Sequence, residues 1–167
     1  PAANIDETTA AATITVGGYS VTLPEGFSGA ASAAAGTDYT FKANGDDYGC
    51  YDVTATMGGE TTTVTNNGDG SFTIKNVTGE IVVTATPKTY TVTVTGTGAG
   101  DVSENAATAT YKTDYTFKLT KADGYNYTVT VTAGGNTVTA TATTEGVYTI
   151  SGADIKGELT ITVEKTA

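Results

Sequence analysis

The chain contains the same unit twice, and this duplication limits what it can fold into. The hexapeptide TDYTFK occupies residues 37–42 and again residues 113–118, which lie 76 residues further along. The same offset aligns most of the flanking sequence without a gap, and two extra residues enter the second copy only near its end. A match of this extent is a tandem duplication. Each copy has about 75 residues, so its fold must be one that a small unit can complete.

The duplication predicts the domain organisation. We expect an N-terminal segment over residues 1–17, a first repeat over residues 18–88 and a second repeat over residues 89–167. The N-terminal segment belongs to neither copy.

Apolar residues alternate with Thr along most of each copy. Tyr127, Val129 and Val131, for example, are separated by Thr residues. Alternation with a period of two is typical of a β-strand with one apolar face, and Thr suits the half-exposed face. Helical periodicity is absent. We expect about six strands in each copy, and in the first copy these are residues 19–23, 37–43, 50–57, 61–65, 71–75 and 80–86.

Strands with one apolar face can bury it when two sheets pack together. The sequence therefore predicts an all-β protein of two tandem Ig-like antiparallel β-sandwich modules, with an extra N-terminal strand. A six-stranded small barrel or a β-grasp-like sheet is the alternative for each copy. Gly-Gly pairs at residues 58–59 and 134–135 interrupt alternating runs, which predicts two-residue hairpin turns there.

The repeated hexapeptide carries the largest side chains of each copy. Tyr39 and Phe41 lie two residues apart, as do Tyr115 and Phe117, so each pair points to one face of its strand. We predict that these four aromatic residues are the repeated core anchors. The Asp, the second Thr and the Lys of the hexapeptide are expected on the solvent-exposed face.

The N-terminal segment contains a short run that resembles the last strand of a repeat. This run consists of Ala12, Thr13, Ile14, Thr15 and Val16, and it is similar to residues 159–163. Three interpretations remain open. The run is an additional edge strand of the first sandwich, the last strand of a module further upstream, or a donor strand that completes the sheet of a neighbouring subunit.

The composition argues against several classes of function. The formal net charge is −10, and the sequence has no His, Arg, Gln or Trp. A His-based catalytic triad and a His/Cys zinc site are therefore excluded. An acidic chain without Arg is also expected to bind nucleic acid poorly. No apolar run is long enough to insert into a membrane. We expect no enzymatic activity and no cofactor. Residues 44–47 and 66–69 supply oxygen ligands that suit Ca²⁺, although ordinary turns explain them more simply.

A few single residues suggest possible modifications. Cys50 is the only cysteine, and it is either an intermolecular or reactive thiol or a small residue tolerated on a strand. Asn76 and Asn126 begin glycosylation sequons. Lys42 and Lys118 are equivalent candidates for an isopeptide cross-link, with exposed salt bridges to Glu80 or Glu158 as the alternative.

The second copy reads DYTF…GY…V…GG…GVYTI…GELTIT over residues 114–162, and the first contains DYTF…GGE…GSFTIKNVTGEIVVT. This pattern resembles repeat modules of bacterial cell-surface and S-layer-associated proteins, especially those of Gram-positive anaerobes. The resemblance implies extracellular Ig-like spacers or adhesive units, and it transfers no catalytic residue. High Thr content and the N-terminal run depart from this pattern and are similar to features of surface-filament subunits.

We therefore expect a non-catalytic structural protein of the cell surface, a stalk, fibre or filament subunit. Its expected partners are other copies of itself or neighbouring modules of the same assembly, and polymerisation would use residues 12–16 as a donor strand. The alternative is an adhesion or carbohydrate-binding module in which Tyr48, Tyr111 or Tyr125 stack on glycans. The absence of Trp weakens that alternative.

Overall fold

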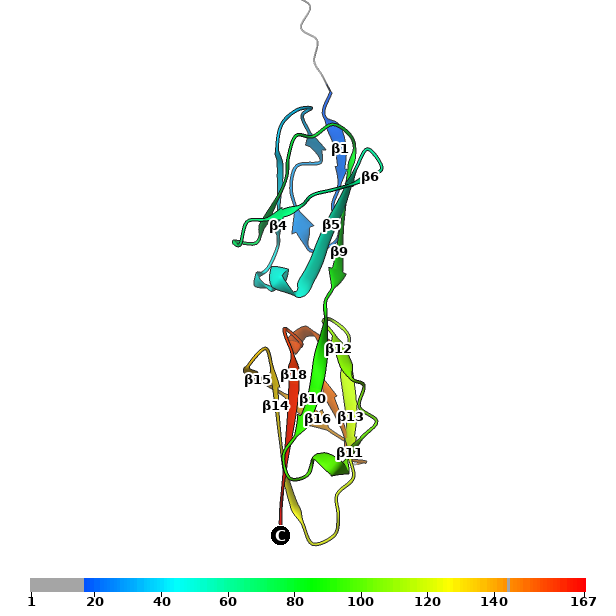
Figure 1. The fold of residues 1–167 in the computed structure, drawn as a ribbon, viewed down its shortest axis with the longest axis vertical. Helices are drawn as coiled ribbons and strands as arrows, with labels where there is room; N and C mark the ends of the chain where they lie inside the picture. Colours follow the sequence, from blue (N-terminus) through cyan, green and yellow to red (C-terminus); the bar gives the residue numbers. More distant parts are fainter. Residues whose placement is uncertain (1–16, 144) are drawn as a thin grey trace, which may run out of the picture.

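The computed structural model describes residues 17–143 and 145–167. These residues form two β-sandwich modules that stand end to end (Figure 1). The prediction of an all-β protein with two tandem sandwiches is confirmed, since the described residues contain only strands, loops and three short 3₁₀ turns. The predicted strand at residues 12–16 lies outside the described residues.

The first module is built from two sheets. The five-stranded sheet has the order β3-β1-β9-β5-β6, and the four-stranded sheet has the order β2-β4-β8-β7. The strands are β1 (Tyr19–Thr22), β2 (Phe27–Ser28), β3 (Ser32–Ala33), β4 (Tyr39–Ala43), β5 (Tyr51–Met57), β6 (Glu60–Thr62), β7 (Thr65–Asn66), β8 (Ser71–Ile74) and β9 (Ile81–Pro87).

The second module has the same architecture. Its sheets have the orders β12-β10-β18-β14-β15 and β11-β13-β17-β16. The strands are β10 (Thr89–Thr95), β11 (Val102–Ser103), β12 (Thr108–Thr110), β13 (Tyr115–Leu119), β14 (Asn126–Ala133), β15 (Asn136–Val138), β16 (Ala140–Ala142), β17 (Val147–Ile150) and β18 (Leu159–Thr166). Each sheet therefore matches its counterpart strand by strand, as expected for a duplicated unit.

The structure departs from the predicted strands in three places. Strands β2 and β3 were not expected, because segments of two residues are too short to show a period. The expected strand at residues 61–65 is split into β6 and β7, which belong to different sheets. The first and last strands of each module, β1 with β9 and β10 with β18, pair in parallel. The purely antiparallel expectation is thus wrong for these pairs, since an alternation pattern does not specify which strand lies alongside.

The aromatic residues of the hexapeptide lie in the two cores. Phe41 and Phe117 are each 1% exposed, and Tyr39 and Tyr115 are each 5% exposed. The ring of Phe41 stacks on that of Phe72 across the β4–β8 pair, with centroids 5.4 Å apart. The two tyrosines also have a polar role that the sequence pattern did not indicate. Their hydroxyls donate 2.7 Å hydrogen bonds to the carbonyl oxygens of Ala30 and Ala106, which ties each connecting loop to the core.

The Asp of the hexapeptide fixes a loop rather than merely facing solvent. Asp38 Oδ1 accepts a 3.0 Å hydrogen bond from the backbone N–H of Asn76. Asp114 Oδ1 accepts the equivalent 2.8 Å bond from Gly152. The loop before the last strand is held this way in both copies, even though the second copy is two residues longer there.

One pair of facing core positions is filled by side chains of different sizes in the two modules. Phe27 lies opposite Ala43 in the first module, and Val102 lies opposite Leu119 in the second. The first pair combines one large and one small side chain, whereas the second combines two of medium size. A well-packed core tolerates such exchanges when the total volume is nearly kept.

The Gly-Gly turns are hairpins, as predicted. Gly58 and Gly59 have φ of 61° and 90°, and Gly134 and Gly135 have φ of 56° and 83°. Positive φ at both central residues is the geometry of a type I′ turn, which glycine adopts without strain.

Candidate functional site

The two modules are joined by a single residue whose polar groups are all bonded. Lys88 is the only residue between β9 and β10. Its backbone N–H donates to the carbonyl of Cys50 at 2.9 Å, and its carbonyl accepts from the N–H of Tyr111 at 3.0 Å. Its ammonium donates to the carbonyl of Gly49 at 2.8 Å. A linker held at its N–H, C=O and side chain to both modules has little freedom to rotate.

Side chains from both modules meet around this linker. The carboxylate of Asp47, in the first module, accepts a 2.7 Å hydrogen bond from the Tyr111 hydroxyl of the second module. It also forms a 2.6 Å salt bridge with the Lys156 ammonium of the second module. The Tyr111 ring meets the Tyr51 ring edge to face, with centroids 5.4 Å apart and planes at 87°. The Lys112 ammonium lies 5.5 Å from the centre of the Tyr51 ring. We call this group of residues the joint.

Cys50 lies inside the joint rather than on a strand. It ends the 3₁₀ turn Asp46–Cys50 and is 6% exposed. Burial raises the pKa of Tyr90 to about 12, and the neighbouring Cys50 side chain adds to this shift. A disulfide between Cys50 and another molecule would therefore require the joint to open.

The joint is expected to weaken in acid. Hydrogen bonds from Lys156 and Tyr111 hold the pKa of Asp47 below its usual value of 3.8. A carboxyl whose pKa is lower in the closed joint stabilises that joint above the usual pKa, and this contribution is lost as the pH falls through the lower value. We expect small-angle X-ray scattering to show a wider spread of module–module distances at about pH 2.5 than at pH 7. The variant Asp47→Asn should lack this part of the acid response. An identical acid response in that variant would contradict the assignment to Asp47.

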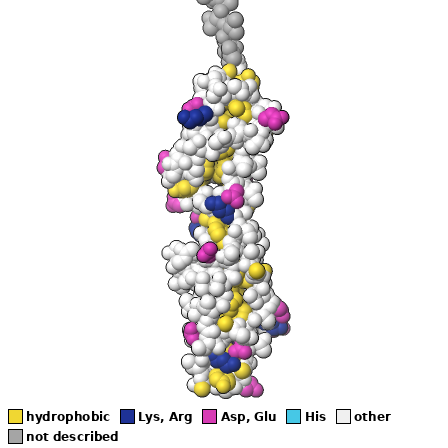
Figure 2. Space-filling view, in the orientation of Figure 1, with side chains coloured by type: hydrophobic (Ala, Val, Ile, Leu, Met, Phe, Trp, Pro, Cys, Tyr) yellow, Lys and Arg dark blue, Asp and Glu magenta, His cyan; other side chains and the backbone are white. Residues whose placement is uncertain are grey.

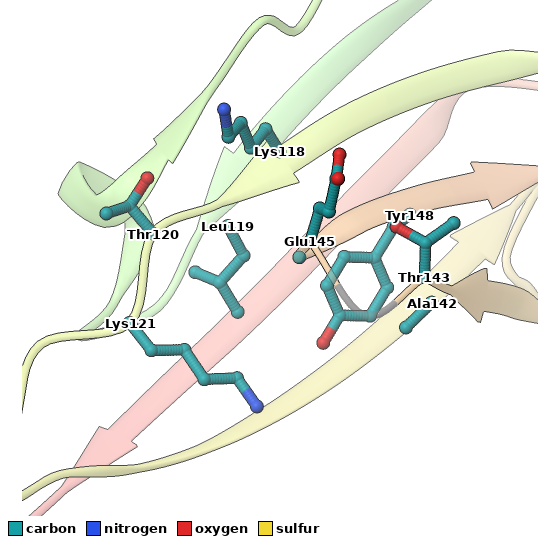
Figure 3. Close-up of a pocket in the computed structure, with 9 residues that line it drawn as sticks. Lys118, Leu119, Thr120, Lys121, Ala142, Thr143, Glu145 and Tyr148 are labelled. Carbon is teal, nitrogen blue, oxygen red and sulfur yellow. The ribbon is translucent and has the colours of Figure 1, made fainter.

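A pocket of about 380 Å³ opens on the second module, away from the joint (Figure 3). Leu119 and Tyr148 line it from β13 and β17, and Lys118, Lys121 and Glu145 lie along its sides. Lys121 and Tyr148 extend toward each other across the opening. Tyr148 stacks on Phe117 of the core at a centroid distance of 4.9 Å, so the pocket borders the core directly.

The tyrosines predicted as glycan platforms have three different environments. Tyr111 is 3% exposed, so its prediction as an exposed platform is wrong, because its ring fills the joint. Tyr48 is half-buried, and its hydroxyl donates to the carbonyl of Gly68 at 3.0 Å. Tyr125 is 47% exposed, and the Lys165 ammonium lies 4.5 Å from the centre of its ring.

The predicted lysine contacts also differ from expectation. Lys118 pairs with Glu104 at 3.4 Å and not with Glu158. The reason is the pairing of β11, a strand that the sequence did not indicate. It places Ser103 opposite Lys118, and Glu104, the residue after Ser103, therefore lies beside Lys118. Lys42 is exposed on the opposite face from Phe41, which leaves it without the burial that isopeptide chemistry requires.

The remaining candidate positions lie on the surface. The sequon residues Asn76 and Asn126 are both exposed. In the loop at residues 66–69, Asn66 Oδ1 accepts from the N–H of Gly68 and Asp69 Oδ1 accepts from that of Ser71, each at 2.9 Å. These oxygens stabilise the turn itself. Over residues 17–143 and 145–167, no three His, Cys, Asp or Glu side chains are grouped as metal ligands. The same residues include no helix that could span a membrane.

Comparison of the chain with protein-family models gives no match, and comparison with curated protein sequences gives none either.

Proposed function

We propose that this protein is a non-catalytic structural spacer of a bacterial cell surface, in which tandem sandwich modules hold a fixed end-to-end arrangement. The observation that carries the proposal is the bonding of Lys88, since a one-residue linker held by both modules transmits orientation from one to the next. Flexible domain pairs, by contrast, are usually joined by longer polar linkers with few contacts.

The surface of the molecule supports an extracellular structural role. In Figure 2 the charged side chains are scattered over the visible face, and most of that face is neither charged nor hydrophobic. Hydroxyl pairs such as Thr89–Thr110 and Thr95–Thr162 bridge neighbouring strands on the outer faces at 3.0 and 3.2 Å. Cross-strand Thr pairs stabilise a sheet without adding charge. The pattern resemblance to surface-layer repeat modules points to the same location.

The proposal requires a rigid joint, and loss of Asp47 tests it. We expect small-angle scattering of the intact chain to give one narrow distribution of module–module distances, and Asp47→Ala to broaden it, because the variant removes the acceptor of both Tyr111 and Lys156. Asp123→Ala is the matched control, since Asp123 occupies the equivalent position in the second copy, away from the joint. A broad distribution in the unmodified chain would contradict a spacer.

The filament form of this proposal depends on residues 12–16, which would act as a donor strand for a neighbouring subunit. Negative-stain electron microscopy of the full chain beside a chain beginning at Gly18 tests it. Filaments that disappear on trimming would support polymerisation, whereas separate two-lobed particles in both samples would contradict it.

Adhesion through glycans is a second candidate that a single observation favours. The Tyr125 ring is 47% exposed, and it belongs to the loop between β13 and β14, which lies at the end of the second module away from the joint (Figure 1). An exposed aromatic face is the usual platform for a sugar ring, although here Lys165 already covers part of it. A glycan-array signal that is lost in Tyr125→Ala would support adhesion, and an array without signal would contradict it.

A further inference from the structure

The loop after the hexapeptide strand differs between the two copies, and the pocket of the second module opens beside this loop. After the hexapeptide strand, the first copy reads Asp-Tyr-Gly-Cys-Tyr over residues 47–51, and the second reads Asp-Gly-Tyr-Asn-Tyr over residues 123–127. The loops have equal length, and the Tyr and Gly at their second and third positions are exchanged.

In the first module this tyrosine packs against the turn between β7 and β8. A Cβ atom built on Gly70 would lie 3.2 Å from Cδ1 of Tyr48, so the ring lies directly over that glycine. The Tyr48 hydroxyl donates to the carbonyl of Gly68 in the same turn at 3.0 Å. The ring also packs against the edge of the first core.

In the second module the equivalent position is Gly124, which has no side chain, and its neighbour Tyr125 lies against Lys165 instead. The pocket is lined by Leu119, Gly146 and Tyr148, and these are the counterparts of Ala43, Gly70 and Phe72 at the 76-residue offset. The pocket thus lies where Tyr48 lies in the first module. The exposure of its walls agrees, since Phe72 is 2% exposed whereas Tyr148 is only half-buried.

We propose that this pocket is a vacant socket for a phenol ring, and that its ligand is a tyrosine side chain presented by a partner polypeptide. Two features of the pocket suit such a ring. Leu119 supplies an apolar lining, and the half-buried ring of Tyr148 supplies an aromatic surface for offset stacking (Figure 3). The Lys121 ammonium, which extends toward the opening, can interact with the π face of an incoming ring. This inference does not depend on the role as a spacer.

Titration of the intact ¹⁵N-labelled chain with N-acetyl-tyrosinamide, followed by NMR, tests the proposal. We expect saturable shifts centred on Leu119, Gly146 and Tyr148, with a dissociation constant of about 1 mM, because a single ring buries little surface. N-acetyl-leucinamide should bind at least about tenfold more weakly. Absence of saturable shifts, equal binding of the two amides, or shifts centred elsewhere would overturn the proposal.

An exchange in the loop tests whether the ligand binds in the space that a tyrosine of the chain itself would fill. Gly124-Tyr125 is replaced by Tyr-Gly, the order of residues 48–49, which leaves Lys121 in place and lets a built-in tyrosine fill the socket. We expect this variant to lose binding of N-acetyl-tyrosinamide. The same exchange with Ala in place of that Tyr is the matched control, and it should bind like the unmodified chain. Retained binding with the Tyr loop, or lost binding with the Ala loop, would contradict the socket.

The reciprocal change makes a second prediction about the first module. Tyr48→Ala empties the equivalent space, so the number of N-acetyl-tyrosinamide molecules bound per chain should rise from one to two, with new shifts near Gly70 and Phe72. If the stoichiometry stays at one in a variant whose spectrum remains that of a folded protein, the equivalence between Tyr48 and the ligand is wrong.

Discussion

Replacement of Phe117 by Ala is expected to lower the free energy of unfolding of the second module by about 3–5 kcal/mol, the usual cost of removing a buried phenylalanine. The side chain is 1% exposed and stacks on Tyr148 with centroids 4.9 Å apart. Tyr148 and its neighbours on β17 are paired with β13 through the backbone, so they cannot collapse far into the space left behind.

Chemical denaturation followed by circular dichroism measures this effect, with Thr116→Ala as the control. Thr116 is the preceding residue on the same strand and points to solvent, so its loss should change stability by less than about 0.5 kcal/mol. Phe41→Ala should destabilise the first module in the same way, since Phe41 is equally buried. A loss below about 1 kcal/mol for Phe117→Ala would show that the hexapeptide is not the anchor of its core.

Replacement of Gly157 by Ala is expected to destabilise the second module by about 1–3 kcal/mol, the range for forcing additional atoms into a packed site. A Cβ atom at Gly157 would lie 2.5 Å from the Cα and 2.9 Å from the N of Gly134. These are backbone atoms of the β14–β15 hairpin turn, so no side chain can rotate away to make room. Gly79 and Gly58 make the same approach in the first module, where the corresponding Cβ would lie 2.8 Å from the Gly58 Cα.

Gly100→Ala is the control for this substitution, because no atom lies within 4 Å of a Cβ built there. The two variants differ in backbone contact and share the change from Gly to Ala, which by itself restricts the unfolded chain and adds stability. Thermal unfolding should therefore show a lower midpoint for Gly157→Ala alone. Equal midpoints for the two variants would mean that the hairpin turn can move aside at no cost.

The strands that could be predicted from the sequence are those with a long alternating pattern. Residues 51–57 and 81–87 alternate over a full strand, and the structure has β5 and β9 there. Strands β2 and β3 lie in the Ala- and Gly-rich stretch between residues 24 and 36, where a pair of residues has no period to detect. Their positions follow from pairing with β4 and β1, which are contacts between distant parts of the chain.

The sequence contains a signal for the pocket but none for the joint. Tyr111 was expected on the surface as a stacking platform for glycans, yet its hydroxyl donates to Asp47, which lies 64 residues earlier. Nothing local to either residue signals that contact. The pocket did leave a signal, since the exchange of Tyr48-Gly49 for Gly124-Tyr125 is visible when the two copies are aligned. Its meaning depends on where the Tyr48 ring lies.

The sequence by itself determined that the chain is a duplicated all-β unit with one aromatic pair per copy, because alternation and repetition are properties of neighbouring residues and of the alignment. The tertiary structure alone decided which strands pair in parallel, that Lys88 is held by both modules, and that a pocket opens beside Tyr148. These features arise from contacts between residues far apart in the chain, and hydrophobic patterning selects the face that is buried without selecting the partner that covers it.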